Sequence, residues 1–213
     1  MRLILASASP ARRAVLRAAG IDPVVEVSGV DEDAVAAALA DPTPAHLVTA
    51  LASAKAEAVL GKAAAEHPDA VVIGCDSMLS MPGDNGPEMV GKPGTQALAR
   101  TRWAAMAGDS GTLLTGHAVI RLTGGAPVAR AADAEATVVR FGKPTDAELD
   151  AYLATGEPLA VAGGFTLDGR GGWFVDGIDG DPSSVIGISL PLTRRLLSEV
   201  GVSVTDLWNI APG

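Results

Sequence analysis

A short, unbroken apolar run from Ala70 to Gly74 constrains the fold of this chain more than any other segment. Apolar runs without polar alternation are typical of strands that are buried on both faces, in sheets that helices cover. We expect this strand to end where Cys75, Asp76 and Ser77 begin, because polar groups at the ends of such strands often bind ligands. A carboxylate there carries a desolvation cost that normally requires a partner, so we expect Asp76 to be functional.

The remaining sequence alternates strand and helix patterns, which predicts an α/β fold. We expect strands at residues 2–6, 24–28, 112–122 and 128–141, and helices at 11–19, 44–66, 95–106, 145–153 and 191–200. Gly124 and Gly125 join the last two strands, so these strands should pair antiparallel. Residues 81–94 are rich in Gly, Pro and Asn and predict a loop. The sequence has no internal repeat and no long linker, and we expect a single domain over residues 1–213.

The net charge argues about which macromolecules this protein can bind, and the single cysteine about the redox state of its compartment. With 16 Lys and Arg against 25 Asp and Glu, the net charge of −9 argues against binding a nucleic-acid polymer. No apolar stretch approaches the roughly 18 residues that a membrane span requires, and the sequence does not open on a basic and apolar leader. Cys75 has no disulfide partner, which fits a reducing compartment. We therefore expect a cytoplasmic protein without a membrane partner.

The segment from Ser7 to Arg13 combines hydroxyls, backbone N–H groups and guanidinium groups at the start of a predicted helix. A helix N-terminus of this composition can bind phosphate. The alternative is a serine-capped helix with Pro10 in its first turn and solvated arginines. Lys55 presents the same choice, because it interrupts an Ala-, Leu- and Val-rich helix and helical lysines usually face solvent.

Carboxylates gather at Asp31, Glu32, Asp33 and Asp76. Carboxylate oxygens suit Mg²⁺ or Mn²⁺, and such ions usually retain waters and bind substrate phosphates as well. Consecutive side chains cannot all point one way, so at most one or two of the triplet should be ligands. The alternative for the triplet is an exposed acidic turn.

Several common catalytic motifs are absent from the sequence. Lys92 is not in a P-loop, because Pro93 stands where Ser or Thr is needed, and no GxGxxG or GxSxG motif occurs. The histidines, which share no metal-ligand spacing and are expected to be structural, are His46, His67 and His117. P-loop, Rossmann, zinc-hydrolase and serine-hydrolase chemistry therefore have no support.

A set of short motifs covers almost the whole chain in a fixed order. They are Leu5-Ala6-Ser7-Ala8-Ser9-Pro10 with Arg12, Val30-Asp31-Glu32, Ala54-Lys55-Ala56, Gly74-Cys75-Asp76-Ser77, Gly91-Lys92-Pro93, Thr115-Gly116, Ala162-Gly163-Gly164-Phe165, Asp168-Gly169-Arg170-Gly171, Ile178-Asp179-Gly180 and Val185-Ile186-Gly187. Each motif alone is weak, but together they resemble the Maf family of nucleoside triphosphate pyrophosphatases. The resemblance implies an elongated mixed sheet wrapped by helices, with a cleft between two lobes, similar to inosine triphosphatase-type enzymes.

The same resemblance implies an activity and a set of site residues. The activity is metal-dependent hydrolysis of a nucleoside triphosphate to the monophosphate and pyrophosphate, with Mg²⁺ or Mn²⁺ as the cofactor. The implied roles are general base and metal ligand for Asp76, metal ligand for Glu32, and phosphate binding for Ser7, Arg12, Lys55 and Lys92. The resemblance also implies a homodimer.

Three positions depart from the pyrimidine-directed pattern of the family. Ala11 stands where those members have Arg, Ser77 where they have Thr, and Asp168 where they have Gln. A carboxylate can accept from guanine N1–H and N2–H₂, whereas uracil or thymine offers only one imide N–H. We expect a shift from dTTP and UTP toward a guanine-type base, or else an open and permissive base pocket.

Two other functions remain open at this point. One is a nucleotide-binding regulator of septum formation or cell division with little turnover. The other is a nucleotidyl or nucleotide-sugar transferase, which would keep the Mg²⁺ site but would need an acceptor pocket that the sequence does not reveal. A water-activating carboxylate such as Asp76 favours the hydrolase over a pure binding protein.

Overall fold

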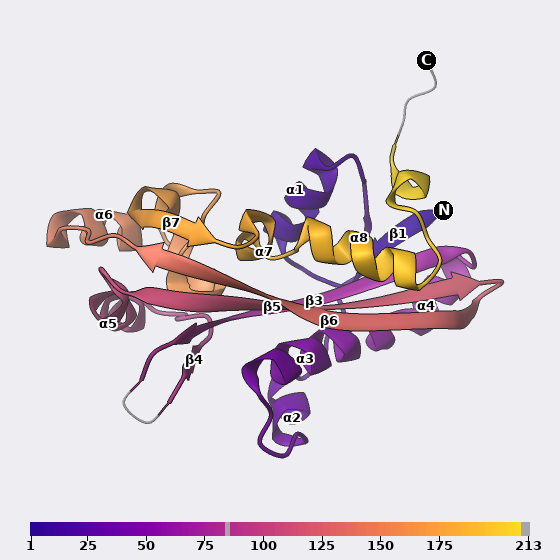
Figure 1. Cartoon of the computed structure of the whole chain (residues 1–213), viewed down its shortest axis with the longest axis horizontal. Coiled ribbons are helices and arrows are strands. Elements are labelled where there is room, and N and C mark those ends of the chain that lie inside the picture. The colour runs from indigo at the N-terminus through magenta and orange to yellow at the C-terminus, as the bar shows by residue number, and fades with distance from the viewer. Residues whose placement is uncertain (84–85, 210–213) are drawn as a thin grey trace. The chain divides into compact units, whose positions relative to one another are not determined.

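The computed structural model describes residues 1–83 and 86–209, and within them seven strands form one mixed sheet (Figure 1). The strands are β1 (Arg2–Leu5), β2 (Val24–Val25), β3 (Ala70–Met81), β4 (Glu88–Val90), β5 (Ser110–Thr123), β6 (Ala126–Phe141) and β7 (Val175–Asp179). Their order is β2-β1-β3-β5-β6-β7, with β4 paired to β3. The β1 strand is parallel to β2 and β3, whereas β4 and β7 pair antiparallel with β3 and β6. The predicted α/β class with a mixed sheet is confirmed.

Helices flank the sheet. They are α1 (Pro10–Ala18), α2 (Glu32–Ala37), α3 (Pro44–Ala58), α4 (Leu60–Glu66), α5 (Gln96–Met106), α6 (Asp146–Ala154), α7 (Pro182–Ile186) and α8 (Leu190–Glu199), with 3-10 helices η1 (Glu157–Ala160), η2 (Ala162–Gly164), η3 (Arg170–Phe174) and η4 (Val204–Leu207). Among the described residues, none of these helices is both long and apolar enough to cross a bilayer.

The chain divides into two compact units. The first unit comprises Met1–Asp76, Thr115–Glu135 and Gly187–Gly213, and the second comprises Ser77–Leu114 and Ala136–Ile186. Strands β3, β5 and β6 each begin in one unit and end in the other. The single domain and the cleft expected from the sequence stay predictions.

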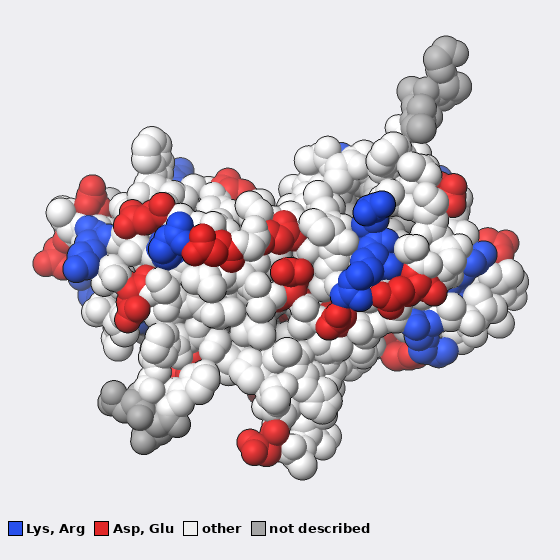
Figure 2. Space-filling view, viewed as in Figure 1, with Lys and Arg blue, Asp and Glu red and all other residues white. Residues whose placement is uncertain are grey.

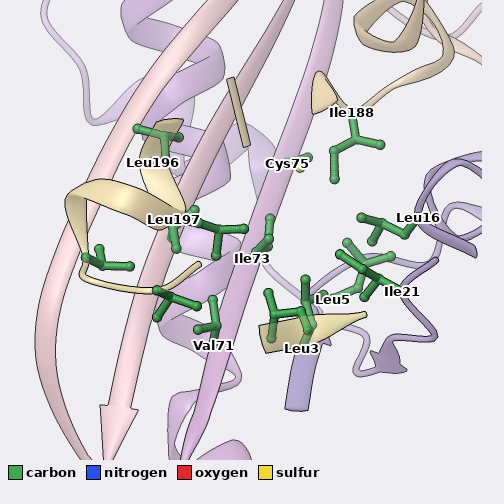
Figure 3. Packing of buried hydrophobic residues seen from close by; sticks show 14 of the residues in the cluster. Leu3, Leu5, Leu16, Ile21, Val71, Ile73, Cys75, Ile188, Leu196 and Leu197 are labelled. Atoms are coloured by element: carbon green, nitrogen blue, oxygen red, sulfur yellow. The ribbon is translucent and has the colours of Figure 1, made fainter. Parts of the chain in front are cut away.

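In the first unit, alternate residues of β3 face opposite layers of helices. Val71, Ile73 and Cys75 pack with Leu16 of α1 and Leu196 of α8 in one buried cluster (Figure 3). On the other face, the side chains of β1, β3 and β5 pack against α3 and α4 in a second cluster, which contains Ile4, Ala52, Ala56, Val72 and Ile120 among others. Because side chains alternate along a strand, Gly74 and Asp76 lie on the face that α3 covers.

Two glycines allow α3 to lie against the backbone of the sheet. A Cβ on Gly74 would lie 2.1 Å from the carbonyl oxygen of Ala52, and a Cβ on Gly116 of β5 would lie 2.2 Å from that of Val48. Val48 and Ala52 are four residues apart and therefore share one face of the helix. Both sheet positions thus require the absence of a side chain, and this close approach brings α3 to Asp76.

Aromatic rings form the centre of the buried core of the second unit. Trp103 of α5 is fully buried, and its ring makes edge contacts with Phe141, Tyr152 and Phe174. Its indole Nε1 donates a hydrogen bond of 2.9 Å to the Gly164 carbonyl, which anchors the glycine-rich segment, residues 163–180, to α5. Most of the few aromatic residues of the chain are therefore used in one small core.

Charges of both signs cover α8 in the first unit (Figure 2). Arg195 contacts Glu199 at 2.8 Å on the same helix and Asp133 of β6 at 2.5 Å. The hydrogen bond from Arg195 lowers the pKa of Asp133. Arg195 is therefore paired within the protein.

The structure corrects four expected elements. Strand β3 continues to Met81, so Asp76 lies within the strand and not after it, and β4 pairs with this extension inside the expected 81–94 loop. The expected 44–66 helix divides at Val59, whose φ of −98° and ψ of −4° depart from helical values. The expected 24–28 strand shrinks to β2, and β7 forms within the glycine-rich segment by pairing with β6. The β5 and β6 strands are neighbours joined by Gly124 and Gly125, and only antiparallel neighbours accept so short a connection.

Candidate active site

Asp76 is a buried carboxylate with one hydrogen-bonded oxygen and one oxygen that has no hydrogen-bond partner in the described part of the chain. Its residue exposure is 6%, and Oδ1 accepts a hydrogen bond of 2.6 Å from Nζ of Lys55. Oδ2 is buried and has no hydrogen-bond partner among the described residues. A buried carboxylate oxygen without a partner is costly, so this atom needs a donor or a cation from outside the protein.

Lys55 joins two carboxylates from different elements. It lies in the last turn of α3 with 8% of the residue exposed, and its Nζ is 2.7 Å from Oε1 of Glu32 and 2.6 Å from Oδ1 of Asp76. An ammonium has three donors, and two are directed at these oxygens. The solvent-facing alternative for Lys55 is therefore wrong, because two of its three donors are used by carboxylates.

The acidic triplet divides between two roles. Asp31 is the N-cap of α2, where its side chain accepts from the backbone N–H of Ala34 at 3.0 Å. Glu32 is the first residue of the helix and is the member that contacts Lys55, with 48% of its side chain exposed. Asp33 is exposed. One member of the triplet therefore contacts Lys55, and the prediction that at most one or two of them are metal ligands stays a prediction.

Ser7 and Arg12 form a second group at the end of β1. Nη1 of Arg12 donates to Oγ of Ser7 at 3.0 Å, and Nε of Arg12 donates to the Gly187 carbonyl at 2.8 Å. Ser9 is the N-cap of α1 and Pro10 is in the first turn, as predicted. The helix is thus capped by serine, and an arginine is also fixed over its first turn. Phosphate binding at this helix start stays a prediction.

The strand order brings both groups to one edge of the first unit. Strands β1 and β3 are parallel neighbours, with Leu5 opposite Ile73. Ser7 follows the end of β1 by two positions, and Asp76 lies within β3 three positions beyond Ile73, so both lie beyond the carboxyl end of β1. Ala11, at the start of α1, is half-buried in the same unit. The carboxyl ends of parallel strands are where α/β proteins usually bind ligands.

Three predicted residues belong to the second unit and are described within it. Ser77 is partly buried in β3, Lys92 is exposed in the connection between β4 and α5, and Asp168 is exposed between η2 and η3. The carbonyl of Gly91 accepts from Nη1 of Arg102 at 2.6 Å, which fixes the backbone beside Lys92.

Glu157 holds the loop that carries Asp168 through hydrogen bonds. The sequence analysis did not identify this glutamate. Its carboxylate accepts hydrogen bonds from the Thr166 hydroxyl and from the backbone N–H of Gly171. Burial alone would raise the pKa of Glu157, but these hydrogen bonds and one from Arg170 outweigh it and lower the pKa. A single glutamate before a glycine-rich segment gives no periodic signal, so only the contacts reveal this role.

The potential metal ligands are few. The described residues contain no group of three or more His, Cys, Asp or Glu side chains arranged to hold a metal ion. Glu32 and Asp76 are the two carboxylates at the site, and both are bound to the same ammonium. Among residues 1–83 and 86–209, these two side chains are the ones that could hold an ion here, and the remaining ligands would come from water or substrate.

The sequence matches known proteins over nearly its full length. The family model described as "Maf-like protein" matches residues 2–200. The chain is 71% identical to a nucleoside triphosphate pyrophosphatase of Saccharopolyspora erythraea, covering 98% of this chain and 97% of the relative. It is 65% identical to a protein of the same name from Rhodococcus jostii, covering 96% and 95%, and 53% identical to one from Mycolicibacterium gilvum, covering 97% and 98%. The chain with the buried Asp76–Lys55 pair belongs to the Maf family.

Proposed function

We propose that this protein hydrolyses a nucleoside triphosphate between its α- and β-phosphates and releases the monophosphate and pyrophosphate. The observation that carries the proposal is the buried Asp76, whose free Oδ2 lies beside an oxygen that Lys55 already holds. The names of the relatives over almost the whole chain support the same activity.

Asp76 is the proposed general base. Lys55 fixes the carboxylate through Oδ1, so Oδ2 can accept a proton from a water molecule. The water oxygen then forms a bond to the α-phosphorus, the bond to the bridging oxygen breaks, and pyrophosphate leaves with the electron pair. The proposed phosphate ligands, which bind charge that develops on the leaving group, are Ser7, Arg12, Lys55 and Lys92.

A divalent cation fits the residues at this site. The unpartnered Oδ2 of Asp76 is a buried acceptor, and Glu32 is half-exposed beside it on the same ammonium. One or two carboxylates plus substrate phosphates are the usual ligands of Mg²⁺. Glu32 and Asp76 would hold Mg²⁺ or Mn²⁺, which supplies positive charge to the phosphate chain when bound.

Ala11, Ser77 and Asp168 are the proposed determinants of base choice. Asp168 is exposed and its loop is held by Glu157, so its carboxylate is available to accept hydrogen bonds from a base. We propose a preference for a guanine-type base over dTTP and UTP for this reason. A strong preference for dTTP among dTTP, UTP, CTP, GTP and 7-methyl-GTP would contradict it.

The decisive experiment is pyrophosphate release from this panel with Mg²⁺ or Mn²⁺, comparing the wild type with Asp76→Asn. The variant keeps the size and the Oδ1 acceptor but loses the base, and we expect its kcat to fall by at least about 10²-fold. Full activity of the variant would show that the base is elsewhere. Binding without turnover by the wild type would instead support a regulatory nucleotide-binding protein.

A further inference from the structure

His117 is fully buried in the first unit and is not part of the site described above. It lies in β5, directly after Gly116, and therefore points to the sheet face opposite α3. Its Nδ1 is 3.0 Å from the Thr115 carbonyl, and its Nε2 accepts from the backbone N–H of Ser189 at 2.8 Å.

These contacts determine the tautomer of the ring. A backbone N–H can only donate, so Nε2 must be an acceptor, and a carbonyl can only accept, so Nδ1 must carry the proton. His117 is thus a neutral imidazole with both nitrogens bound. The Nε2 acceptor is the part of this side chain that an apolar residue of similar size would lack.

The segment 187–189 connects His117 to Arg12 through two hydrogen bonds. Ser189 is the N-cap of α8, Ile188 is fully buried in the core, and Gly187 accepts from Nε of Arg12 at 2.8 Å. The segment 187–189 is therefore anchored at each of its three residues. A Cβ on Gly187 would lie 3.3 Å from Cγ and Nε of Arg12, so the backbone and the guanidinium stem are already in close contact.

We propose that His117 is a positioning residue for the phosphate-binding Arg12. The imidazole accepts from the backbone N–H of Ser189 and so holds the 187–189 segment in place. The carbonyl of Gly187 in this segment then binds Nε of Arg12 and directs the guanidinium toward Ser7. The inference rests on the proposed function in that it takes Arg12 as a ligand of the phosphate chain.

The test compares His117→Leu with His117→Gln. Leucine fills the space without an acceptor, whereas the glutamine side-chain oxygen reaches the position of Nε2 and can accept from Ser189. We expect His117→Leu to weaken binding of inorganic pyrophosphate with Mg²⁺ by roughly tenfold in calorimetric titration, the range of one hydrogen bond to a charged group. The same variant should raise KM for the triphosphate more than it lowers kcat, and His117→Gln should restore most of the affinity. His46→Leu, at an exposed histidine, is the matched control and should leave both values unchanged.

The outcomes separate this inference from the proposed function. Equal pyrophosphate affinity of the folded Leu, Gln and wild-type proteins would overturn the positioning role, even if turnover is normal. Absence of turnover in the wild type would overturn the proposed function, while a loss of affinity in His117→Leu would still support the inference. If His117→Leu does not fold, His117→Asn replaces it, because asparagine reaches only the Nδ1 position; affinity equal to that of His117→Gln would then overturn the proposal.

Discussion

Replacing Gly74 by alanine tests whether the close approach of α3 to β3 builds the site. The added Cβ would lie 2.1 Å from the Ala52 carbonyl oxygen and 2.9 Å from the Ala56 nitrogen. Both contacts are with helix backbone, which cannot rotate away as a side chain can. Lys55 lies between these two residues on the same turn, so any movement of the helix also moves its ammonium away from Asp76.

The size of the effect follows from the contact distances. Restoring an ordinary contact of 3.4 Å requires α3 to retreat by about 1.3 Å along this line. The same retreat stretches the 2.6 Å contact between Lys55 and Asp76 beyond hydrogen-bond length. Overpacking costs about 1–3 kcal/mol and loss of a buried ion pair costs more, so we expect Gly74→Ala to lower the free energy of unfolding by at least about 2 kcal/mol. A misplacement of about 1 Å at the site should also reduce kcat/KM by about 10²-fold.

Urea denaturation and the rate of pyrophosphate release measure the two effects. The matched control is Gly61→Ala in α4, where an added Cβ meets no atom within 4 Å. Alanine is the better helix former, so this variant should be unchanged or more stable by about 0.5 kcal/mol and fully active. The reasoning would be refuted if Gly74→Ala behaved like Gly61→Ala in both assays.

Two further predictions concern buried side chains outside the catalytic group. Burial raises the pKa of the Cys75 thiol to about 11, so the unfolded chain ionises first and stability should fall by about 2 kcal/mol between pH 9 and pH 11. Urea titrations of wild type and Cys75→Ala over this range should diverge by that amount, and parallel curves would contradict the argument. Trp103→Phe removes the indole donor to Gly164 and leaves a gap among the rings, so the free energy of unfolding should fall by about 3 kcal/mol in the same assay. A loss below about 1 kcal/mol would show that neither the bond nor the packing matters there.

Local patterns made much of the first unit predictable. The apolar run before Asp76 indicated a doubly buried strand, and Ser9 with Pro10 indicated the start of α1. Both patterns involve only residues that are adjacent in the chain, so they can be recognised without the tertiary structure. The break of the 44–66 helix at Val59 has no such signal, because the nearby Gly61 lies inside α4 and no proline is present at the break. Strand β4 has none either, because it exists only through its pairing with β3.

The candidate residues were found from motifs, but their connections were not. By itself the sequence determined the α/β class and an aspartate directly after a buried apolar run, whereas the extension of β3 past Asp76 and the glycines beside α3 came from the structure. Only the tertiary structure decided that Lys55 binds both Glu32 and Asp76, and that Gly187 holds Arg12 from 175 residues away. The physical reason is that periodicity specifies which face of an element is buried, whereas the packing of helix on strand specifies which atoms meet across that face.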